Sequence, residues 1–303
     1  MSQVTGLIAT LITNPQTPLI TADIARAAAH ALGAKGHEWL ATDIAVDIPL
    51  PDEMPAVEAD ALLRKLLAGL PIDIAIQNRA TRRKAMLIAD MDSTMIEQEC
   101  IDELAAMAGL KDRVSAITAR AMNGEIAFEP ALRERVALLA GLPFSIIETV
   151  LAERISYTPG GKALVATMRA HGAFTALVSG GFTAFTAPVA AALGFDANRA
   201  NTLHQVGGVL AGTVAEPILG RQAKVDALDE FAAQRGISPT DVLAIGDGAN
   251  DLGMLHRAGT GVALHAKPSV AAEAKIRIDH GDLTALLYVQ GYHQSEFAGT
   301  DGR

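Results

Sequence analysis

A short apolar run that ends in two aspartates constrains this chain more than any other part of its sequence. Residues Ala85–Ala89 are all apolar, and such a run bounded by polar residues is typical of a buried strand. Asp90 and Asp92 follow it, and because side chains alternate along an extended segment, both carboxylates point the same way. Ligands of open α/β sheets bind beyond the carboxyl ends of the strands. The run therefore predicts an acidic site at a sheet edge; the alternative is an ordinary turn capped by Asp90 and Ser93.

The two carboxylates of this predicted site lie close enough to repel each other. Repulsion raises the pKa of one carboxyl group unless a cation neutralises the pair. One acid can therefore serve as a nucleophile while the other donates a proton.

Size and composition favour an α/β protein of two domains. The chain has 303 residues, of which 50% are hydrophobic and 4% aromatic, and its net charge is −9. The negative charge argues against nucleic acid or an anionic membrane as a partner. No apolar stretch is long enough to span a bilayer, and the N-terminus lacks the features of a signal peptide. The single cysteine, Cys100, excludes an internal disulfide, so we expect a cytoplasmic protein.

Residues 1–80 are predicted to form a separate N-terminal domain. The periodicity indicates alternating strands and helices. These elements are expected near Gly6–Thr13, Ala22–Leu32, Trp39–Ile48, Val57–Leu67 and Ile72–Gln77. This α+β pattern resembles the ACT family of domains, which often sense amino acids and often pair between subunits. That family has one more strand, which residues 38–50 would have to supply by bending. The basic segment Asn78–Lys84 is predicted to be a solvated hinge.

Residues 81–293 are predicted to form the main α/β domain, with a small helical cap inserted after its first strand. In the cap, at about residues 97–156, apolar residues recur at helical spacing between glycine and proline breaks. Strands and helices alternate after it, which predicts a mostly parallel sheet. The further elements are strands at Phe174–Val178, Val242–Ile245 and Gly261–Leu264, helices at Gly161–Ala170, Ala184–Leu193 and Gln222–Arg235, and a hairpin of Thr202–Val206 with Val209–Val214. Residues 294–303 are predicted to be a flexible tail.

Three other segments are expected near the acidic strand end. The sequence SGG at Ser179 follows a strand, and its backbone N–H groups suit an anion, although SGG is also an ordinary turn. Lys224 begins a helix and can offer its charge to a phosphate, although a surface lysine is the default interpretation. The sequence GDGAND places Asp247, Asn250 and Asp251 after another apolar strand. Their oxygen ligands suit Mg²⁺, whereas the alternative is a turn that binds nothing.

Together, these segments predict a phosphoryl-transfer site. Mg²⁺ would offset the crowded charge of Asp90, Asp92 and a phosphate group, so that Asp90 can attack phosphorus. Ser179, the nearby N–H groups and Lys224 would stabilise the transferred phosphoryl group. Asp92 would protonate the departing oxygen and later accept a proton from water.

The motifs DMDST, SGG, the helical lysine and GDGAND resemble the four motifs of the haloacid-dehalogenase superfamily of phosphatases. The likeness covers roughly residues 85–290 and implies a Rossmann-like core with a helical cap. Within the superfamily the chain is similar to the phosphoserine phosphatase family, also along DMDSTMIEQECIDELA and AMNGEIAFEPALRERVALLAGLP. This resemblance implies hydrolysis of O-phospho-L-serine with Mg²⁺, the last step of L-serine biosynthesis.

The resemblance also implies roles for individual residues at the metal. Asp90 would be the nucleophile and a metal ligand, and Asp92 the general acid and base, with its backbone carbonyl on the metal. Asp247 would complete the protein ligands of Mg²⁺, and Asn250 and Asp251 would orient the site.

The substrate contacts implied by the resemblance come from the core and the cap. Ser179, Gly180 and Lys224 would hold the phosphate. In the cap, Glu99 would meet the substrate ammonium and Arg135 its carboxylate, with Met122 and Phe128 closing over them.

This cap assignment agrees with the chemistry of a small zwitterion, because arginine binds a carboxylate in a bidentate manner. The alternative is that Glu99 and Arg135 are ordinary surface charges on helices.

Other functions stay open from the sequence alone. The same chemistry with a hydroxylated amino acid in place of water would give a phosphotransferase, for example one acting on homoserine. A phospho-receiver signalling module is a third reading, but the second carboxylate and the helical insertion argue against it. For the ACT-like domain, two roles are open: binding of L-serine as a feedback ligand, or a structural role that includes homodimer formation.

Overall fold

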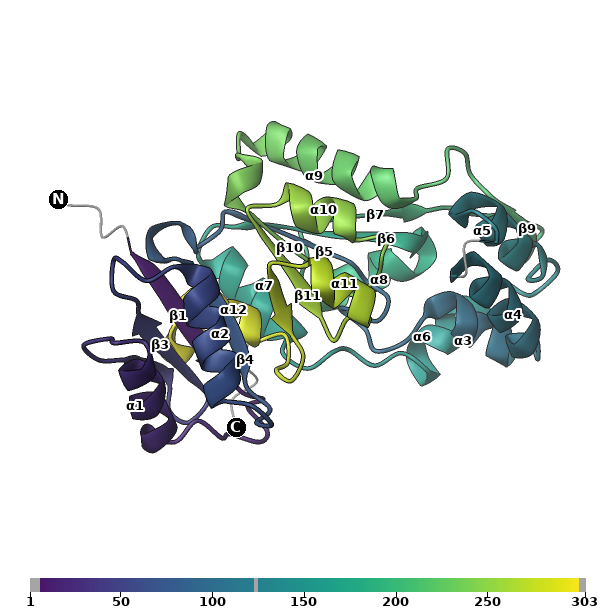
Figure 1. Ribbon diagram of the computed structural model, residues 1–303. Coiled ribbons are helices and arrows are strands. Elements are labelled where there is room, and N and C mark those ends of the chain that lie inside the picture. The colour runs from purple at the N-terminus through teal and green to yellow at the C-terminus, as the bar shows by residue number, and fades with distance from the viewer. Residues whose placement is uncertain (1–5, 123–124, 300–303) are drawn as a thin grey trace.

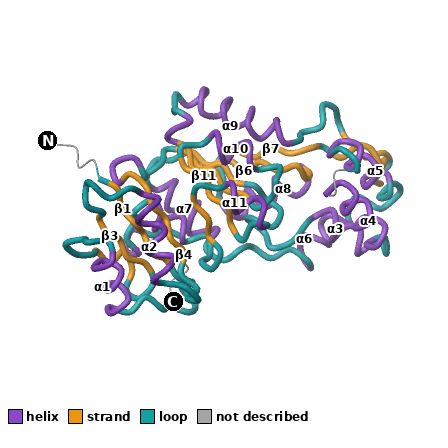
Figure 2. Tube along the Cα trace, viewed as in Figure 1, coloured by secondary structure: helices purple, strands orange, loops and turns teal. Residues whose placement is uncertain are grey.

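The computed structural model describes residues 6–122 and 125–299 of the chain. An antiparallel sheet from the N-terminal residues, a parallel sheet and a group of helices follow one another across Figure 1, with the parallel sheet in the middle. Figure 2 shows the two sheets as separate groups of orange strands.

The middle part contains a parallel sheet of six strands. Across the sheet they are β12 (Ile276–Ile278), β11 (Thr260–Leu264), β10 (Val242–Gly246), β5 (Met86–Ala89), β6 (Phe174–Phe182) and β7 (Ala197–Asn201). Every neighbouring pair is parallel. Strand β5, which precedes the two aspartates, lies between β10 and β6. The carboxyl ends of these three strands therefore meet at one edge.

Helices cover both faces of this sheet, because strand residues alternate between the two faces. In β5, Met86 and Ile88 belong to one buried cluster, whereas Leu87 and Ala89 belong to the other. The first face packs against α9 (Arg221–Arg235), α10 (Leu252–Arg257) and α11 (Pro268–Glu273), and the second against α7 (Gly161–Ala170), α8 (Thr183–Leu193) and α12 (Ala285–Val289). Among residues 6–122 and 125–299, no helix is both long and apolar enough to cross a membrane.

The expected helical cap lies between β5 and α7. It contains α3 (Cys100–Met107), α4 (Lys111–Met122), α5 (Phe128–Ala137) and α6 (Ile146–Glu153). Its two connections to the core pair with each other, since Ile96 forms an antiparallel bridge with Tyr157.

A hairpin from the core is attached to this cap. The predicted hairpin is present as β8 (Leu203–Val206) and β9 (Val209–Val214). Gly141 N donates to Leu210 O at 2.9 Å, and Phe144 N donates to Gly208 O at 2.8 Å.

The N-terminal part forms an antiparallel sheet in the order β2-β3-β1-β4. Its elements are β1 (Leu7–Ile12), α1 (Ala22–Ala31), β2 (Glu38–Ala41), β3 (Ala45–Pro49), α2 (Ala56–Leu66) and β4 (Asp73–Asn78). The single strand expected at Trp39–Ile48 is wrong, because a turn with Asp43 at φ 61° divides it into two. Aspartate tolerates this left-handed conformation better than most residues. The division gives the βαββαβ order of ferredoxin-like domains.

Charged side chains join this sheet to the parallel-sheet part. Arg82 is only 7% exposed to solvent, and its Nη2 is 2.7 Å from Asp47 Oδ2 in β3. The Asp73 carboxylate accepts hydrogen bonds from the backbone N–H groups of Asp279 and Gly281, both at 2.7 Å. The segment around Arg82, which we expected to be a solvated hinge, is therefore partly buried between the two sheets.

Several elements were not predicted from the sequence. Residues 294–299, which we placed in a flexible tail, begin with a 3₁₀ turn at Gln294–Glu296, and Phe297 packs against Tyr288. Further 3₁₀ turns occupy Arg79–Thr81 and Pro239–Asp241. Strands β7 and β12 and helices α10, α11 and α12 were also missed because they are short or polar.

Candidate active site

The strand order brings the predicted acidic residues to the middle of the sheet edge. Asp90 follows β5, and its backbone N–H donates to Ile245 O of β10 at 3.0 Å. Asp247 follows β10, and Ser179 lies in β6 on the other side of β5. Four segments that are distant in the sequence therefore meet here once Lys224 of α9 is included.

Lys224 lies between two buried carboxylates. Its Nζ is 2.6 Å from Asp90 Oδ1 and 2.6 Å from Asp251 Oδ1. Burial and the neighbouring Asp251 hold the pKa of Asp90 well above its ordinary value, although Lys224 opposes this shift. Burial alone would lower the pKa of Lys224, but attraction to Asp251 and Asp90 raises it instead. The lysine is therefore a fixed cation at this site.

The negative charge at this site exceeds what one lysine can offset. Ligand atoms of Asp90, Asp247 and Asp251 lie within 4.8 Å of one another. Burial and Asp251 raise the pKa of Asp247. These carboxylate oxygens are the hard ligands that Mg²⁺ prefers, so the residues fit a divalent cation.

Asp251 has its oxygens engaged by the protein itself. Its Oδ1 contacts Lys224, and its Oδ2 accepts hydrogen bonds from the N–H groups of Asp247 at 3.2 Å and Gly248 at 3.0 Å. Asp90 and Asp247 thus remain as the side chains best able to bind the cation directly. Asn250 lies on the same loop, with its Oδ1 close above Gly248.

The Asp92 carboxylate is not one of this group of three and has other partners. Its Oδ1 accepts a hydrogen bond from Cys100 N at 2.8 Å, and its Oδ2 accepts one from Ser179 Oγ at 3.1 Å. Both contacts hold the carboxylate next to the predicted phosphate loop. There it can donate or accept a proton, and the resemblance assigns only its backbone carbonyl to the metal.

A side chain at either glycine of the predicted phosphate loop would crowd a neighbouring side chain. Ser179 Oγ accepts a hydrogen bond from Gly181 N at 2.8 Å. A Cβ atom on Gly181 would lie 2.9 Å from Asp92 Oδ2, and one on Gly180 would lie 3.2 Å from Phe128 Cζ. The backbone can therefore approach a ligand closely at these two positions.

Phe128 at the start of α5 contacts the core. The Arg135 guanidinium of the same helix donates within the cap, from Nε to Ala131 O at 3.2 Å and from Nη1 to Thr118 Oγ1 at 3.4 Å. The Phe128 ring lies over Gly180 and Gly220. Arg135 is half-buried, and burial lowers its pKa, while attraction to Asp102 and Glu99 opposes this shift. The last residue of α4, Met122, has a side chain outside the described residues.

Glu99 begins the cap and faces the core acids. Its Oε1 accepts a hydrogen bond from Ser93 Oγ at 2.9 Å. Solvent still reaches this side chain, but the surrounding protein and the charge of Asp92 raise the pKa of Glu99 to about 7. Acidic Glu99 and basic Arg135 thus lie on the cap side of the site, within electrostatic reach of each other.

Two contacts at the site were missed from the sequence. Thr94 Oγ1 donates to Asp247 Oδ1 at 3.0 Å and thereby joins the first motif to the last. Cys100 donates a backbone hydrogen bond to Asp92 Oδ1 at 2.8 Å. The hydroxyl of Thr94 within DMDST is a sequence signal from which its contact could have been predicted. A backbone N–H group leaves no such signal, because every residue except proline has one.

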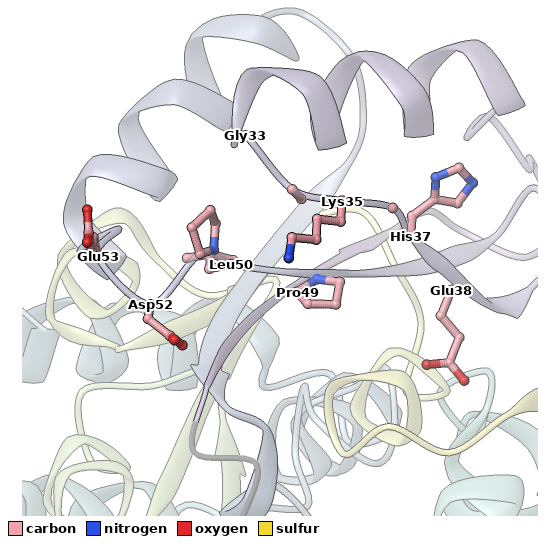
Figure 3. Close-up of a pocket in the computed structure, with 11 residues that line it drawn as sticks. Gly33, Lys35, His37, Glu38, Pro49, Leu50, Asp52 and Glu53 are labelled. Carbon is pink, nitrogen blue, oxygen red and sulfur yellow. The ribbon is translucent and has the colours of Figure 1, made fainter.

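A separate hollow of about 740 Å³ lies in the N-terminal part. Figure 3 shows it between the end of α1 and the turn after β3, with Lys35, Glu38 and Asp52 among its side chains.

Comparison with known proteins identifies the family. Residues 87–256 match the haloacid dehalogenase-like hydrolase family. The chain belongs to this family. It is 43% identical over 236 residues to a phosphoserine phosphatase of Streptomyces coelicolor, covering 77% of this chain. The match spans 57% of that relative, so this chain corresponds to less than two thirds of its length.

Two solved structures resemble nearly the whole chain. A hydrolase from Salmonella enterica serovar Typhi has a TM-score of 0.84 at 28% identity, covering 94% of this chain and 98% of its own. A probable phosphoserine phosphatase from Vibrio cholerae has a TM-score of 0.77 at 30% identity, covering 97% and 88%. The similarity thus includes the N-terminal part as well as the core.

Proposed function

We propose that the protein hydrolyses O-phospho-L-serine to L-serine and phosphate, and so completes L-serine biosynthesis. The observation that carries this proposal is the pair of opposite charges that the cap supplies, Glu99 at the start of α3 and Arg135 in α5, beside a haloacid-dehalogenase site. If the substrate phosphate binds at Lys224, the ammonium and carboxylate groups of the substrate would lie on the cap side of the site. The phosphoserine phosphatases among the similar proteins support the same substrate.

In the proposed mechanism Asp90 attacks phosphorus and forms an aspartyl phosphate, while Asp92 gives a proton to the departing seryl oxygen. Water then attacks the aspartyl phosphate, Asp92 takes its proton, and phosphate leaves. Ser179, the N–H groups of its loop and Lys224 stabilise the charge on phosphorus. Mg²⁺ held by Asp90 and Asp247 would supply the positive charge that this crowded site needs.

The test is a phosphate-release assay on phosphoserine, with and without Mg²⁺. The proposal expects multiple turnovers that stop when Mg²⁺ is chelated and return when it is added back. Addition of homoserine tests the phosphotransferase alternative, because a phosphohomoserine product would replace free phosphate. Titration with L-serine tests feedback; feedback, homodimer formation and a cytoplasmic location stay predictions from the sequence.

Arg135→Ala should weaken binding of phosphoserine but not of phosphoethanolamine, which lacks the carboxylate. Loss of a charged, partly desolvated partner is expected to raise KM for phosphoserine about 30-fold or more. Neighbouring Arg133 is a matched control, since it is exposed and contacts Glu216 at 2.7 Å instead of facing the site. Steady-state kinetics on both substrates measure the effect, and an equal loss on both would refute the role of Arg135.

Binding of phosphoserine should weaken as the pH falls below about 7, if Glu99 holds the substrate ammonium. The raised pKa of Glu99 means that the carboxylate becomes neutral near that pH and loses its attraction for a cation. Glu99→Gln should have a higher KM for phosphoserine at pH 8, and its kcat/KM should not show the decrease near pH 7 that is due to Glu99. Profiles of kcat/KM for the parent and the variant check this, and identical profiles would exclude the assignment.

A further inference from the structure

The groups that would bind phosphate belong to two segments that are distant in the sequence. Ser179 and Gly180 lie in β6, whereas Lys224 lies in the first turns of α9, shortly after Leu219 and Gly220. Phosphoryl transfer depends on accurate positions of such groups. A contact between the two segments is therefore needed to fix the distance from the loop to the lysine.

Asn201, the last residue of β7, makes this contact with three hydrogen bonds. Its Nδ2 donates to Gly180 O at 2.8 Å and to Leu219 O at 3.3 Å. Its Oδ1 accepts from Leu219 N at 2.7 Å. The residue is 2% exposed, so water does not compete for these bonds.

The Asn201 carboxamide forms its hydrogen bonds where the backbone pairing of β6 with β7 is interrupted. Strands β6 and β7 pair in register up to Val178, and the register then shifts so that Phe182 lies opposite Asn201. Ser179 and Gly180 belong to the interrupted stretch. A side chain that pairs with Gly180 O there replaces the missing backbone partner.

The same side chain also joins the two segments that Phe128 of the cap contacts. The Phe128 ring lies over Gly180 on one segment and Gly220 on the other. Asn201 joins both segments, so its loss would disturb the loop and the surface under Phe128 together.

We propose that Asn201 is a positioning residue for phosphoryl transfer. Its carboxamide holds the Gly180 loop at a fixed distance from the segment that leads into Lys224. Within the described part of the chain its hydrogen-bond partners are backbone atoms of Gly180 and Leu219, so it acts through the loop and not on the reacting atoms. This inference rests on the proposed phosphatase function.

The test compares Asn201→Asp with Asn198→Asp. In Asn201→Asp an oxygen replaces the donor and faces two carbonyl oxygens, while the acceptor for Leu219 N stays. Asn198 is exposed on the same strand, and its Oδ1 accepts a bond from Thr186 at 3.0 Å, which aspartate can keep. Both variants place a carboxyl group on β7, but only the first replaces the carboxamide nitrogen that donates to Gly180 O.

With saturating Mg²⁺, Asn201→Asp is expected to lower kcat about 10- to 100-fold and to weaken inhibition by inorganic phosphate by a similar factor. The Kd of Mg²⁺ in the absence of substrate should stay close to the parent value. Asn198→Asp should keep parental kinetics. Asn201→Ser, which removes the bonds without adding charge, gives the same comparison if the aspartate variant does not fold.

Two outcomes would overturn the inference. One is a folded Asn201 variant with parental kcat and parental phosphate inhibition. The other is a variant in which kcat, Mg²⁺ affinity and Tm all fall together, as a merely structural residue would cause. Parallel assays with 4-nitrophenyl phosphate distinguish failure of this inference from failure of the proposed function. If the parent protein hydrolyses only that ester, the phosphoserine proposal is refuted, but the effect of the Asn201 variants can still be measured.

Discussion

Asp90→Asn should abolish turnover of phosphoserine while leaving the protein folded. An amide is not a nucleophile toward phosphorus, so the expected loss in kcat is at least about 10⁴-fold. The fold should not suffer, because burial and Asp251 already disfavour the ionised form of Asp90. The raised pKa has a definite sign: the folded state holds the Asp90 proton more tightly, so ionisation costs stability as the pH rises through that pKa.

Thermal unfolding without Mg²⁺ measures the second part of this prediction. The variant cannot ionise at this position, so its Tm should equal or exceed that of the parent, and its advantage should grow as the pH rises above the ordinary pKa of an aspartate. Asp226→Asn, on the exposed side of α9, is the matched control and should change neither property. Appreciable turnover by folded Asp90→Asn would remove Asp90 from the role of nucleophile.

Lys224→Met should destabilise the protein strongly, and Mg²⁺ should restore part of the loss. The substitution leaves Asp90 and Asp251 buried without the cation that contacts both at 2.6 Å. Removing one partner from a buried charge group typically costs about 3–5 kcal/mol. Bound Mg²⁺ would supply positive charge to the same carboxylates, so the difference in Tm between variant and parent should narrow when it is added.

Lys224→Met should also lower kcat about 10²- to 10³-fold, because a charge that stabilises the transition state is lost. Arg221→Met removes an exposed cation from the same helix and is the matched control. A Lys224→Met protein as stable as the parent without Mg²⁺ would show that the lysine does not balance these carboxylates.

The sequence allowed the central part of the fold to be predicted because its pattern is local. The apolar run at Met86–Ala89 and the acidic residues after it identify a strand end without knowledge of the partners. The same holds for Val242–Gly246 before Asp247. Parallel sheets place such ends together, so the meeting of Asp90 and Asp247 followed from general rules.

Other features depend on contacts that no local pattern records. Strand β7 reads Ala-Asn-Arg-Ala-Asn and lacks strand-forming residues; pairing with β6 determines its conformation. The three bonds of Asn201 and the backbone donor of Cys100 are visible only in three dimensions. The burial of Arg82 beside Asp47 could not be predicted either, because a basic segment taken alone indicates solvent exposure.

The measurement that most directly tests the mechanism is chemical trapping of a phosphorylated protein. The protein would be mixed with [³²P]phosphoserine and Mg²⁺, quenched in acid from milliseconds to a full turnover, and digested for peptide mapping. The mechanism predicts a label on the peptide that contains Asp90, formed before phosphate is released and absent in Asp90→Asn. Release of phosphate with no label on that peptide at any time, or with the label on another residue, would contradict it.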